Sequence, residues 1–494
     1  MHSPQWRDED SRSVFIGLDL GTSGLKGLAV SLDGQVLARG HATYVTHRPE
    51  PGASEQDPSH WLNAVASVVA QLSEQCPVDS WSSIGLSGMI PTLVCLDEAK
   101  KPVGRSITWE DGRADAFGDT LREAFGAEKL YELTGQWMDG RYLLPMWSRL
   151  RSVEPDRYLS ARTLVSAKDF IFTSLTDVLA TDPSTATGFG CFQLADGQWN
   201  SMMLSLANCE LSLPTVYPST HFEPLSESVA QWLGLPAGMP VCLGAADSVL
   251  GAMGMGVTEP GDIAYVAGTS TVILGVTDSA PVDSHHRFIL TPMALEGLWG
   301  VEMDLLSTGG AIRWFAAMLG QSDETQALQL AEQSTGENVP IFLPYVAPGE
   351  QGALWDSTLT GTIVGLELSH SSGDLMRSLI NGIVLESLRC TEVLTEIGFP
   401  VGNLQVAGGS ALSPWFRQQL ADATGRVVVA PVDGDSDYSA LGAAMIAAIS
   451  QGKEIANSQR KTTMIEPLEE HRSIWLDRFA VHEKVRLSHI SQMD

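Results

Sequence analysis

The chain is poor in basic residues. It carries 30 Lys and Arg against 59 Asp and Glu, a formal net charge of −29 over 494 residues. Proteins that bind nucleic acid or anionic membrane surfaces place clustered cations against the phosphates. The charge balance therefore argues against both kinds of partner.

Paired cysteines and long apolar runs are also missing. None of the six cysteines forms a C-x-x-C pair or lies near a histidine at metal-ligand spacing, which predicts reduced, buried thiols. No uncharged run of eighteen apolar residues occurs, as a membrane-spanning helix would need. The first residues are polar and acidic, without the apolar segment of a signal peptide. We therefore expect a cytoplasmic protein.

The two commonest nucleotide-binding motifs are absent as well. No G-x-x-x-x-G-K-[ST] occurs, which excludes a P-loop protein, and no convincing G-x-G-x-x-G follows the first expected strand. Any nucleotide site in this chain must be built differently.

What the chain does contain is a repeated strand–turn–strand pattern. Apolar strands at 14–20 and 25–30 flank one Gly-Thr-Ser turn, and strands at 263–266 and 271–276 flank another. The turns begin at Gly21 and Gly268, an offset of 268 − 21 = 247 residues, which is half the chain and far beyond a solenoid period. Gly, Thr and Ser are common turn residues, so chance is the alternative. The flanking strands and the offset favour a duplicated α/β domain, as does the chain length.

Other local signals predict the remaining elements that position the motifs. We expect a helix within 57–75 capped by Asp57, strands at 83–88, 238–244 and 404–407, helices from Pro414 and over 438–450, and a terminal helix from about Trp475 with a frayed tail.

Each Gly-Thr-Ser turn is a candidate phosphate site. Successive backbone N–H groups of such a turn converge on one anion, and the hydroxyls add donors. One set comprises Gly21, Thr22 and Ser23, and the other Gly268, Thr269 and Ser270. Two such turns could hold the ends of a polyphosphate, which points to ATP.

Charged residues beside the first turn have two interpretations each. Asp19 ends a buried strand, where a carboxylate near phosphate implies an intervening Mg²⁺, held through water. A turn-capping aspartate is the alternative. Lys26 either offsets phosphate charge or is a solvated lysine on the second strand.

Asp247 lies between small residues in "LGAADSVLGAMGMGV". A kinase that phosphorylates a hydroxyl needs a carboxylate to take its proton, and Asp247 suits that role. A helix N-cap is an equal alternative from these residues alone.

The stretch "AGGSALSP", 407–414, places two glycines directly after a strand. Gly408 and Gly409 would let a flat ring, such as a nucleotide base, lie against the backbone. Gly-Gly also makes ordinary turns.

Taken in order, these stretches resemble the FGGY family of carbohydrate kinases, and most of all its xylulokinase branch. The resemblance covers nearly the whole chain and rests on the following segments: "IGLDLGTSGLKGLAV", "SITWEDGRAD", "LVSAKDFIFTSLTDVLATDPSTATG", "GAADSVLGAMGMG", "FLPYVAPGE", "GTIVGLELSHSSGDLMRSLINGI" and "VAGGSALSPWFRQQLADATG".

The resemblance implies two ribonuclease-H-like domains of the actin, Hsp70 and hexokinase superfamily, with ATP and sugar meeting in a cleft between them. The boundaries that we expect are a flexible N-terminus at 1–13, an N-terminal domain at 14–244, a C-terminal domain at 245–480 and a tail at 481–494. Many relatives form dimers, so a homodimer is an expectation of the resemblance alone.

The resemblance also implies roles for individual residues. Asp247 becomes the general base, Asp19 lies near Mg²⁺, and the two turns, with Lys26, contact the phosphates. The adenosine site takes Gly408, Gly409, Ser410 and Ser413. The carbohydrate site takes Met89, Ile90, Trp109, Glu110 and Asp111.

Departures from the family pattern fall mostly near the acceptor. Xylulokinases typically have Ser-Gly-Gln-Met-His-Gly where this chain has Ser-Gly-Met-Ile-Pro-Thr, 87–92. Loss of two polar side chains suggests a different or less polar acceptor. Trp-Asn-Asp becomes Trp-Glu-Asp at 109–111, Ser410 replaces the third glycine of the adenosine turn, and Met146 replaces a lysine. A pentulose such as D-xylulose is the first expectation. Another sugar, polyol or aldonate, of the ribulose, erythritol or gluconate type, is the alternative.

Two other functions are compatible with the phosphate turns. An actin- or Hsp70-like ATPase would not need the 109–113 segment and usually has a further binding domain, for which the two halves leave no room. A degenerate kinase that binds a sugar and regulates is the other interpretation. Absence of Asp247 would have favoured it, but Asp19, Asp247 and both turns are present.

Overall fold

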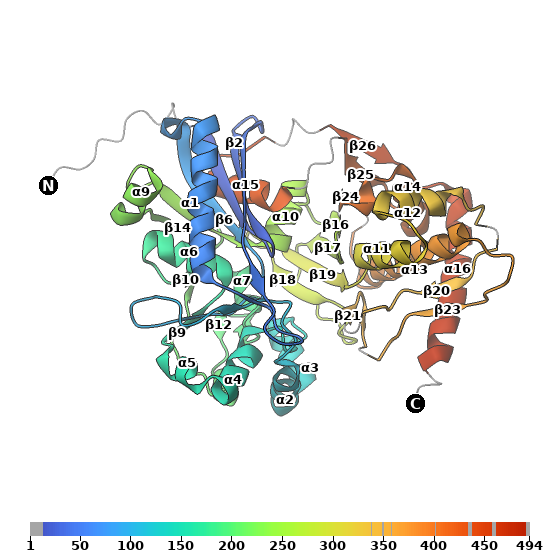
Figure 1. The fold of residues 1–494 in the computed structure, drawn as a ribbon, viewed down its shortest axis with the longest axis horizontal. Coiled ribbons are helices and arrows are strands. Elements are labelled where there is room, and N and C mark those ends of the chain that lie inside the picture. The colour runs from blue at the N-terminus through green and yellow to red at the C-terminus, as the bar shows by residue number, and fades with distance from the viewer. Residues whose placement is uncertain are drawn as a thin grey trace. The chain divides into compact units, whose positions relative to one another are not determined.

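A computed structural model describes residues 13–336, 338–347, 350–356, 358–400, 402–432, 437–456 and 461–490. The chain divides into two compact units (Figure 1). The first contains the described residues of Met1–Gly256, Leu290–Leu298 and Asp437–Gln459, and the second those of Val257–Ile289, Trp299–Ser436 and Arg460–Asp494. The flexible segment expected at 1–13 falls outside the described residues except for Ser13.

A mixed sheet forms the centre of the first unit. Its strand order is β14-β15-β6-β1-β2-β3, in which β15, β6 and β1 are mutually parallel and the other neighbours are antiparallel. The strands are β1 (Val14–Leu20), β2 (Gly24–Ser31), β3 (Val36–Thr43), β6 (Trp81–Gly88), β14 (Phe222–Pro224) and β15 (Pro240–Ala246).

Helices cover both faces of this sheet because β1 is apolar on both sides. Ile16 and Leu18 pack with α1 (Pro58–Gln75), which lies along the sheet in Figure 1. Phe15, which alternates with them, packs with α15 (Tyr438–Ser450). A Cβ on Gly17 would lie 1.7 Å from the carbonyl oxygen of Ala440, so glycine allows α15 to touch the strand. Helix α6 (Ala167–Thr176) packs against β6 and β15, α7 (Pro183–Thr187) contacts β15, and α9 (Glu227–Leu233) contacts α1. Helix α10 (Asp247–Met255) packs with α15 in the core that contains Phe15.

A second apolar core of the first unit includes Leu93, Trp147 and Phe189. The remaining helices and short strands of the first unit are α2 (Asp115–Phe125), α3 (Ala127–Thr134), α4 (Leu143–Val153), α5 (Pro155–Ser160), α8 (Ser201–Leu206), β4 (Thr46–His47), β5 (Glu55–Gln56), β7 (Val94–Leu96), β8 (Ser106–Ile107), β9 (Thr163–Val165), β10 (Ala180–Thr181), β11 (Phe192–Gln193), β12 (Gln198–Trp199) and β13 (Thr215–Val216).

The second unit contains a sheet with the order β22-β21-β19-β17-β16-β24-β25-β26. Its strands are β16 (Ile263–Ala267), β17 (Thr271–Thr277), β19 (Trp299–Leu305), β21 (Glu350–Gln351), β22 (Leu354–Trp355), β24 (Leu404–Gly408), β25 (Val428–Pro431) and β26 (Thr462–Ile465). Strands β20 (Ile341–Leu343) and β23 (Thr362–Val364) pair with each other in a separate two-stranded sheet. Strand β18 (Ile289–Pro292) lies at the point in the sequence where the chain passes from one unit to the other.

Strand by strand, the second sheet repeats the first. The series β26, β25, β24, β16, β17 and β19 follows the same directions as β14, β15, β6, β1, β2 and β3. Each Gly-Thr-Ser turn connects the two corresponding antiparallel strands, β1 with β2 and β16 with β17. The duplication that the sequence offset predicted is therefore a duplication of topology.

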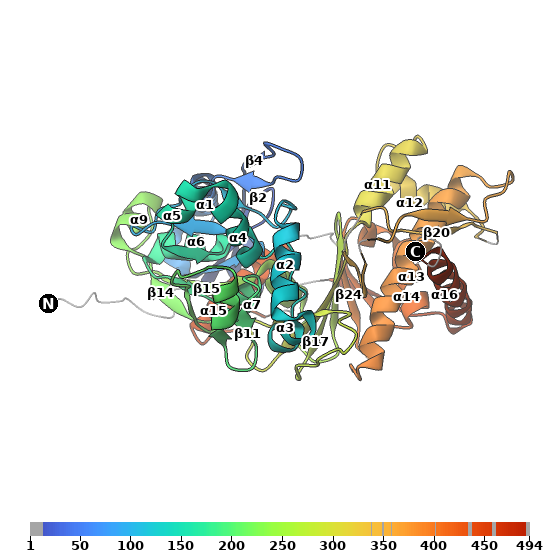
Figure 2. The same ribbon diagram turned by 90° about the horizontal axis from the view of Figure 1, so that it is seen from below.

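Helices of the second unit pack around α13 (Ser372–Glu396). Figure 2 shows α13 with α14 (Pro414–Thr424) and α16 (Glu469–Ile490), and the three contact one another. Helices α11 (Gly309–Met318) and α12 (Glu324–Gln333) contact α13 as well. The capping box of α13, in which Ser371 and Asp374 satisfy each other's backbone N–H groups, sets where this helix begins.

Two expected boundaries differ from the structure. The 245–480 segment does not stay together, because α10 packs on α15 and β15 and α15 packs on β1 and β6, so both helices belong to the first unit. The terminal helix begins at Glu469 rather than near Trp475 and continues through residues 481–490, which we expected as a tail. His482 is buried there, so the helix continues because one of its faces is packed.

All six cysteines are buried free thiols, as predicted. In the part of the chain that the structure describes, no helix is both long and apolar enough to cross a membrane.

Candidate functional site

Three parallel strands of the first unit end at one edge of its sheet. In the register of β1 with β6, Asp19 lies opposite Ser87, and in that of β6 with β15, Gly88 lies opposite Ala246. Asp19, the 87–92 loop and Asp247 therefore emerge side by side. Ligands of open α/β sheets bind outside the carboxyl ends of parallel strands.

Asp19 is a poorly solvated carboxylate on this edge. Its Oδ1 accepts a hydrogen bond of 2.8 Å from the Ser87 hydroxyl. Burial raises the pKa of Asp19, although Ser87 and the charge of Lys26 oppose the shift. Lys26, its partner on β2, forms an ion pair of 3.0 Å with Asp437. The charge of Asp19 is thus only partly neutralised, and a bound cation would stabilise the ionised form of this carboxylate.

Side chains from outside the first Gly-Thr-Ser turn hold it in place. The N–H of Gly21 donates to the carbonyl oxygen of Gly24 over 3.1 Å, and the Tyr44 hydroxyl donates to the carbonyl oxygen of Gly21. Trp109 Nε1 donates to the Thr22 hydroxyl over 3.0 Å, and Gln56 donates to the Thr22 carbonyl oxygen over 2.7 Å. Ser23, the third predicted contact, is exposed beside them.

Asp247 is the first residue of α10, with Ala246 in the capping position. Its Oδ1 accepts the N–H of Ser248 over 3.0 Å, and its carbonyl oxygen accepts a hydrogen bond of 3.1 Å from Ser439. A carboxylate in the first turn of a helix is stabilised by the helix dipole. Asp247 is half-buried.

A fully buried ionic cluster supports the backbone before Asp247. Lys168 Nζ lies 2.8 Å from Asp169 Oδ1, 3.1 Å from Asp182 Oδ1 and 3.1 Å from the carbonyl oxygen of Leu243 on β15. The two carboxylates outweigh burial and raise the pKa of Lys168, whereas burial outweighs Lys168 and raises the pKa of Asp169. Lys168 thus offers one positive charge to two buried carboxylates. Ionisation of both carboxylates at once is therefore disfavoured.

The same cluster reaches the residue adjoining Asp247. Asp182 Oδ2 accepts hydrogen bonds from the N–H of Ser184, over 3.0 Å, and from its hydroxyl, over 2.5 Å. The Ser184 oxygen in turn accepts the N–H of Ala246 over 2.9 Å. Lys168 and Asp182 therefore fix the end of β15 from two sides.

The predicted carbohydrate residues have different surroundings. Met89 follows β6, is 1% exposed and packs in the core between the sheet and α1. Ile90 is partly buried and packs against the core that contains α15. Glu110 forms an ion pair of 2.7 Å with Arg48. Asp111 is buried, where it accepts hydrogen bonds from Arg113 and from the N–H of Ser54. Trp109 is the member of this set whose hydrogen bond to Thr22 links it to the first Gly-Thr-Ser turn.

The second Gly-Thr-Ser turn belongs to the second unit, where Gly268 and Thr269 are exposed and Ser270 is half-buried. Arg313 on α11 donates to the Thr269 hydroxyl over 3.0 Å. The carbonyl oxygen of Thr269 accepts the N–H groups of Thr308, over 3.2 Å, and Gly310, over 2.9 Å. The start of α11 therefore abuts this turn.

The Gly-Gly segment lies next to that turn, because Gly408 of β24 is the partner of Ala267 at the end of β16. Gly408 has a φ of +98°, and a Cβ there would lie 2.1 Å from the Ala267 carbonyl oxygen, so glycine is required. The N–H of Gly409 donates to the same oxygen over 3.0 Å. The Ser410 hydroxyl donates to Glu324, which also pairs with Arg313 at 3.2 Å, and Ser413 caps α14.

Each unit thus places some of the predicted residues beside its own Gly-Thr-Ser turn, Trp109 in the first and Gly408 in the second, whereas Met89 lies in the core. Tyr44, Gln56 and Arg313 contact these turns, and Glu324 pairs with Arg313. These four were missed, because no local pattern marks a residue that contacts a distant turn. Arg113 carried a signal, since it lies inside the Trp-Glu-Asp-Gly-Arg segment. Among the described residues, no group of three or more His, Cys, Asp or Glu side chains is placed to hold a metal ion.

Comparisons with known proteins match this architecture. Residues 14–254 match the N-terminal domain of the FGGY family of carbohydrate kinases, and residues 263–451 match its C-terminal domain. The gluconokinase of Bacillus licheniformis is 27% identical over 456 residues, which cover 89% of this chain and 88% of that protein. The xylulose kinase of Escherichia coli strain K12 is 29% identical over 449 residues, which cover 89% of this chain and 91% of that protein.

A solved structure agrees. The xylulose kinase from Rhodospirillum rubrum superimposes with a TM-score of 0.89 at 27% identity, over 96% of this chain and 98% of that one. Because two consecutive family models span most of the sequence, the chain belongs to the FGGY family of carbohydrate kinases.

Proposed function

We propose that this carbohydrate kinase transfers the γ-phosphoryl group of ATP to a hydroxyl of a pentulose, with D-xylulose as the first candidate. The observation that carries the proposal is the common edge of β1, β6 and β15, where Asp19 and Asp247 emerge side by side. A phosphoryl-transfer site needs one carboxylate for the cation and another for the acceptor proton. The Escherichia coli xylulose kinase supports the choice of sugar.

Asp247 would act as the general base. As the acceptor oxygen bonds to phosphorus, its proton passes to the Asp247 carboxylate, the bond from the γ-phosphorus to the bridging oxygen breaks, and ADP leaves with the electron pair. The N–H of Ser248 holds one carboxylate oxygen, and the Ser184 and Lys168 contacts fix the strand before it. Such positioning keeps the base within reach of the hydroxyl.

Asp19 is the residue that would hold Mg²⁺. Its carboxylate accepts a hydrogen bond from Ser87 and is poorly solvated, so a cation would stabilise its charged form. Mg²⁺ in kinases is typically bound by one or two carboxylates together with phosphate and water, and it neutralises charge on the transferred group. The Gly21–Ser23 and Gly268–Ser270 turns would contact the phosphates, and Gly408 and Gly409 the adenosine.

Gluconate is a second candidate acceptor. It is favoured by the similarity to the Bacillus licheniformis gluconokinase and by the loop after β6, where Met89 is turned into the core and offers no polar side chain. A loop that lacks the glutamine and histidine of the xylulokinase pattern would discriminate less strongly between a ketose and other acceptors.

The test is ADP release with Mg-ATP across D-xylulose, D-ribulose, erythritol and D-gluconate. Asp247→Asn should lower kcat by about 10²–10⁴-fold for the preferred acceptor while ATP binding is retained. Glu227→Gln, which alters an exposed carboxylate in the first turn of α9, should leave kcat unchanged.

Each outcome separates the parts of the proposal. Highest kcat/KM for D-xylulose supports the pentulose assignment, and highest kcat/KM for gluconate replaces it with the second candidate. Full activity of the Asp247→Asn variant would remove Asp247 from the mechanism and leave the kinase assignment intact.

A further inference from the structure

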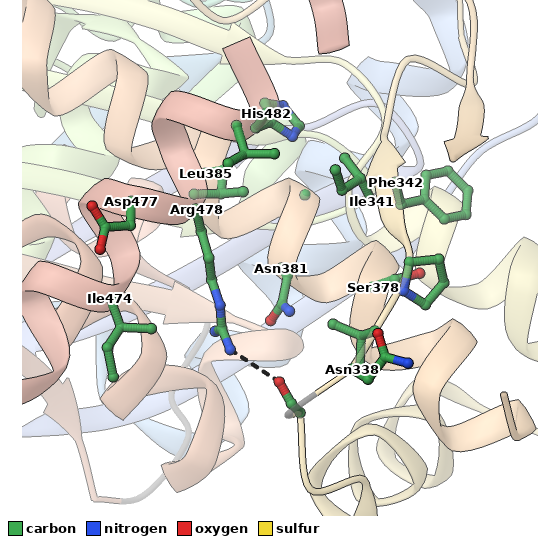
Figure 3. Close-up of a pocket in the computed structure, with 15 residues that line it drawn as sticks. Asn338, Ile341, Phe342, Ser378, Asn381, Leu385, Ile474, Asp477, Arg478 and His482 are labelled. Carbon is green, nitrogen blue, oxygen red and sulfur yellow. Dashed lines mark hydrogen bonds between the residues drawn. The ribbon is translucent and has the colours of Figure 1, made fainter. Parts of the chain in front are cut away.

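The second unit contains a cavity that has no part in the site described above. It has a volume of about 360 Å³ and lies between α13, α16 and the 338–342 segment that leads into β20 (Figure 3). A cavity of this size can hold one small metabolite. None of the residues assigned to the phosphate, adenosine or carbohydrate sites lines it.

A buried amide without partners faces this cavity. Asn381 on α13 is 6% exposed, and its Oδ1 is buried and makes no hydrogen bond to any described residue. A buried amide without a partner costs about 1–3 kcal/mol. Figure 3 shows the amide directed into the space between α13 and α16. A bound molecule with hydroxyl or amide groups would satisfy it.

A histidine lines the opposite end of the cavity (Figure 3). His482 on α16 is 1% exposed, and its Nε2 lies 2.8 Å from Glu386 Oε1. Its Nδ1 is buried without a hydrogen-bond partner in the described part of the chain. The Glu386 contact fixes the orientation of the imidazole ring, which forms part of the cavity wall.

The charged group of the cavity is Arg478. It reaches from α16 toward Asn381 and donates to the backbone carbonyl oxygen of Gly336 over 3.1 Å (Figure 3). Among the described residues it forms no ion pair with a carboxylate, and burial lowers its pKa. Arg377 lies close to Arg478. Burial lowers the pKa of Arg377 most, and the charge of Arg478 lowers it further. Arg377 also donates to a backbone carbonyl oxygen, that of Ser334, and lies near the carboxylate of Asp374.

Most of the remaining lining is apolar and includes Ile341, Phe342 and Leu385, with the exposed Ile474 and Val481. The polar side chains of Asn338 and Ser378 also line the cavity. Asp477 also lines the cavity, but Figure 3 shows its carboxylate turned away from Asn381. A ligand anion placed against Arg478 would therefore avoid the one acidic side chain in the lining.

We propose that this cavity binds a small organic anion, whose carboxylate or phosphate group pairs with Arg478 and whose hydroxyl groups bond with Asn381. Charge-assisted bonds to arginine are stronger than neutral ones, so Arg478 supplies most of the affinity and Asn381 the orientation. The site is separate from the transfer chemistry and stands whether or not the acceptor sugar is a pentulose.

The experiment is isothermal titration of the full chain with citrate, 3-phosphoglycerate and inorganic phosphate, with glycerol as the uncharged probe. We expect saturable binding of citrate or 3-phosphoglycerate and none of glycerol. Arg478→Ala should weaken that binding at least about tenfold. Asn381→Leu should also weaken it, without lowering the melting temperature of the unliganded protein, since it removes an unsatisfied amide.

Two further variants locate the binding. Lys484→Ala removes an exposed charge from the same helix and should bind as the wild type does. Arg313→Ala removes the cation beside the Thr269 turn and should also bind normally. Loss of binding in Arg313→Ala with retention in Arg478→Ala would assign the anion to the phosphate turn and overturn the proposal. Absence of saturable binding by both organic anions would overturn it as well.

Discussion

The buried ammonium of Lys168 allows the sharpest prediction about stability. Lys168→Met keeps the length of the side chain but removes the charge that faces Asp169 and Asp182 and the donor to the carbonyl oxygen of Leu243. Lys168 and both carboxylates are 0% exposed, so water cannot replace the lost contacts without opening the core.

The expected loss is large for a single substitution. Removing one partner of a buried ion pair costs about 3–5 kcal/mol, because the remaining charge is left without compensation. For a unit of this size that corresponds to a fall of about 10 °C in melting temperature. Lys100→Met is the matched control, since Lys100 pairs with Asp177 on the surface, where such pairs contribute at most about 1 kcal/mol.

The loss should depend on pH. Burial already raises the pKa of Asp169 in the folded protein, and removal of the Lys168 cation should raise it further above the value in the unfolded chain. Groups with a raised folded pKa contribute stability at low pH that is lost as the pH rises. The deficit of Lys168→Met should therefore be smaller at pH 5 than at pH 8.

Urea unfolding at pH 5, 6, 7 and 8, followed by tryptophan fluorescence and circular dichroism, measures the deficit. Initial rates test the structural consequence, since Lys168 and Asp182 fix the strand that leads to Asp247, and kcat should fall at least about tenfold. A deficit below about 1 kcal/mol, equal at every pH, would refute the account of the cluster.

Three further predictions follow from packing, charge and the phosphate turn. Gly17→Ala should destabilise the first unit by at least about 3 kcal/mol in urea unfolding, because its Cβ would lie 1.7 Å from a carbonyl oxygen of α15; Gly21→Ala, whose Cβ has no contact closer than 3.4 Å, is the control. Arg389 and His482 outweigh burial and hold the pKa of Glu386 far below its usual 4.5, so wild-type stability should fall as the pH drops below 4.5, and Glu386→Gln should abolish most of that slope while lowering stability at pH 7. Trp109→Phe removes the hydrogen bond to Thr22, which should cost about 1 kcal/mol in urea unfolding and raise KM for ATP several-fold; an unchanged KM would separate Trp109 from the turn's function.

Elements with local signals were predicted well from the sequence. The α1 helix begins at Pro58 after its Asp57 cap, whose side chain accepts the N–H of Ser59 over 2.9 Å. The small-residue helix occupies Tyr438–Ser450, as expected. Caps, turns and apolar periodicity act between residues a few positions apart, so the sequence records them directly.

The candidate site was predicted in part. Asp19 and Asp247 emerge at the ends of parallel strands, where the pattern placed them, while their chemical roles stay predictions until the variants are assayed. Tyr44 and Arg313 were not found, because each contacts its Gly-Thr-Ser turn from another element, 23 and 44 residues away.

By itself the sequence determined the two strand–turn–strand units, their separation by half the chain and the family motifs that follow in order. Only the tertiary structure decided that α10 and α15 belong to the first unit, that Lys168 faces two carboxylates, and that Asn381 and Arg478 line one cavity. These features depend on which distant surfaces exclude water together, and burial of that kind is set by packing between elements rather than by the order of residues within one.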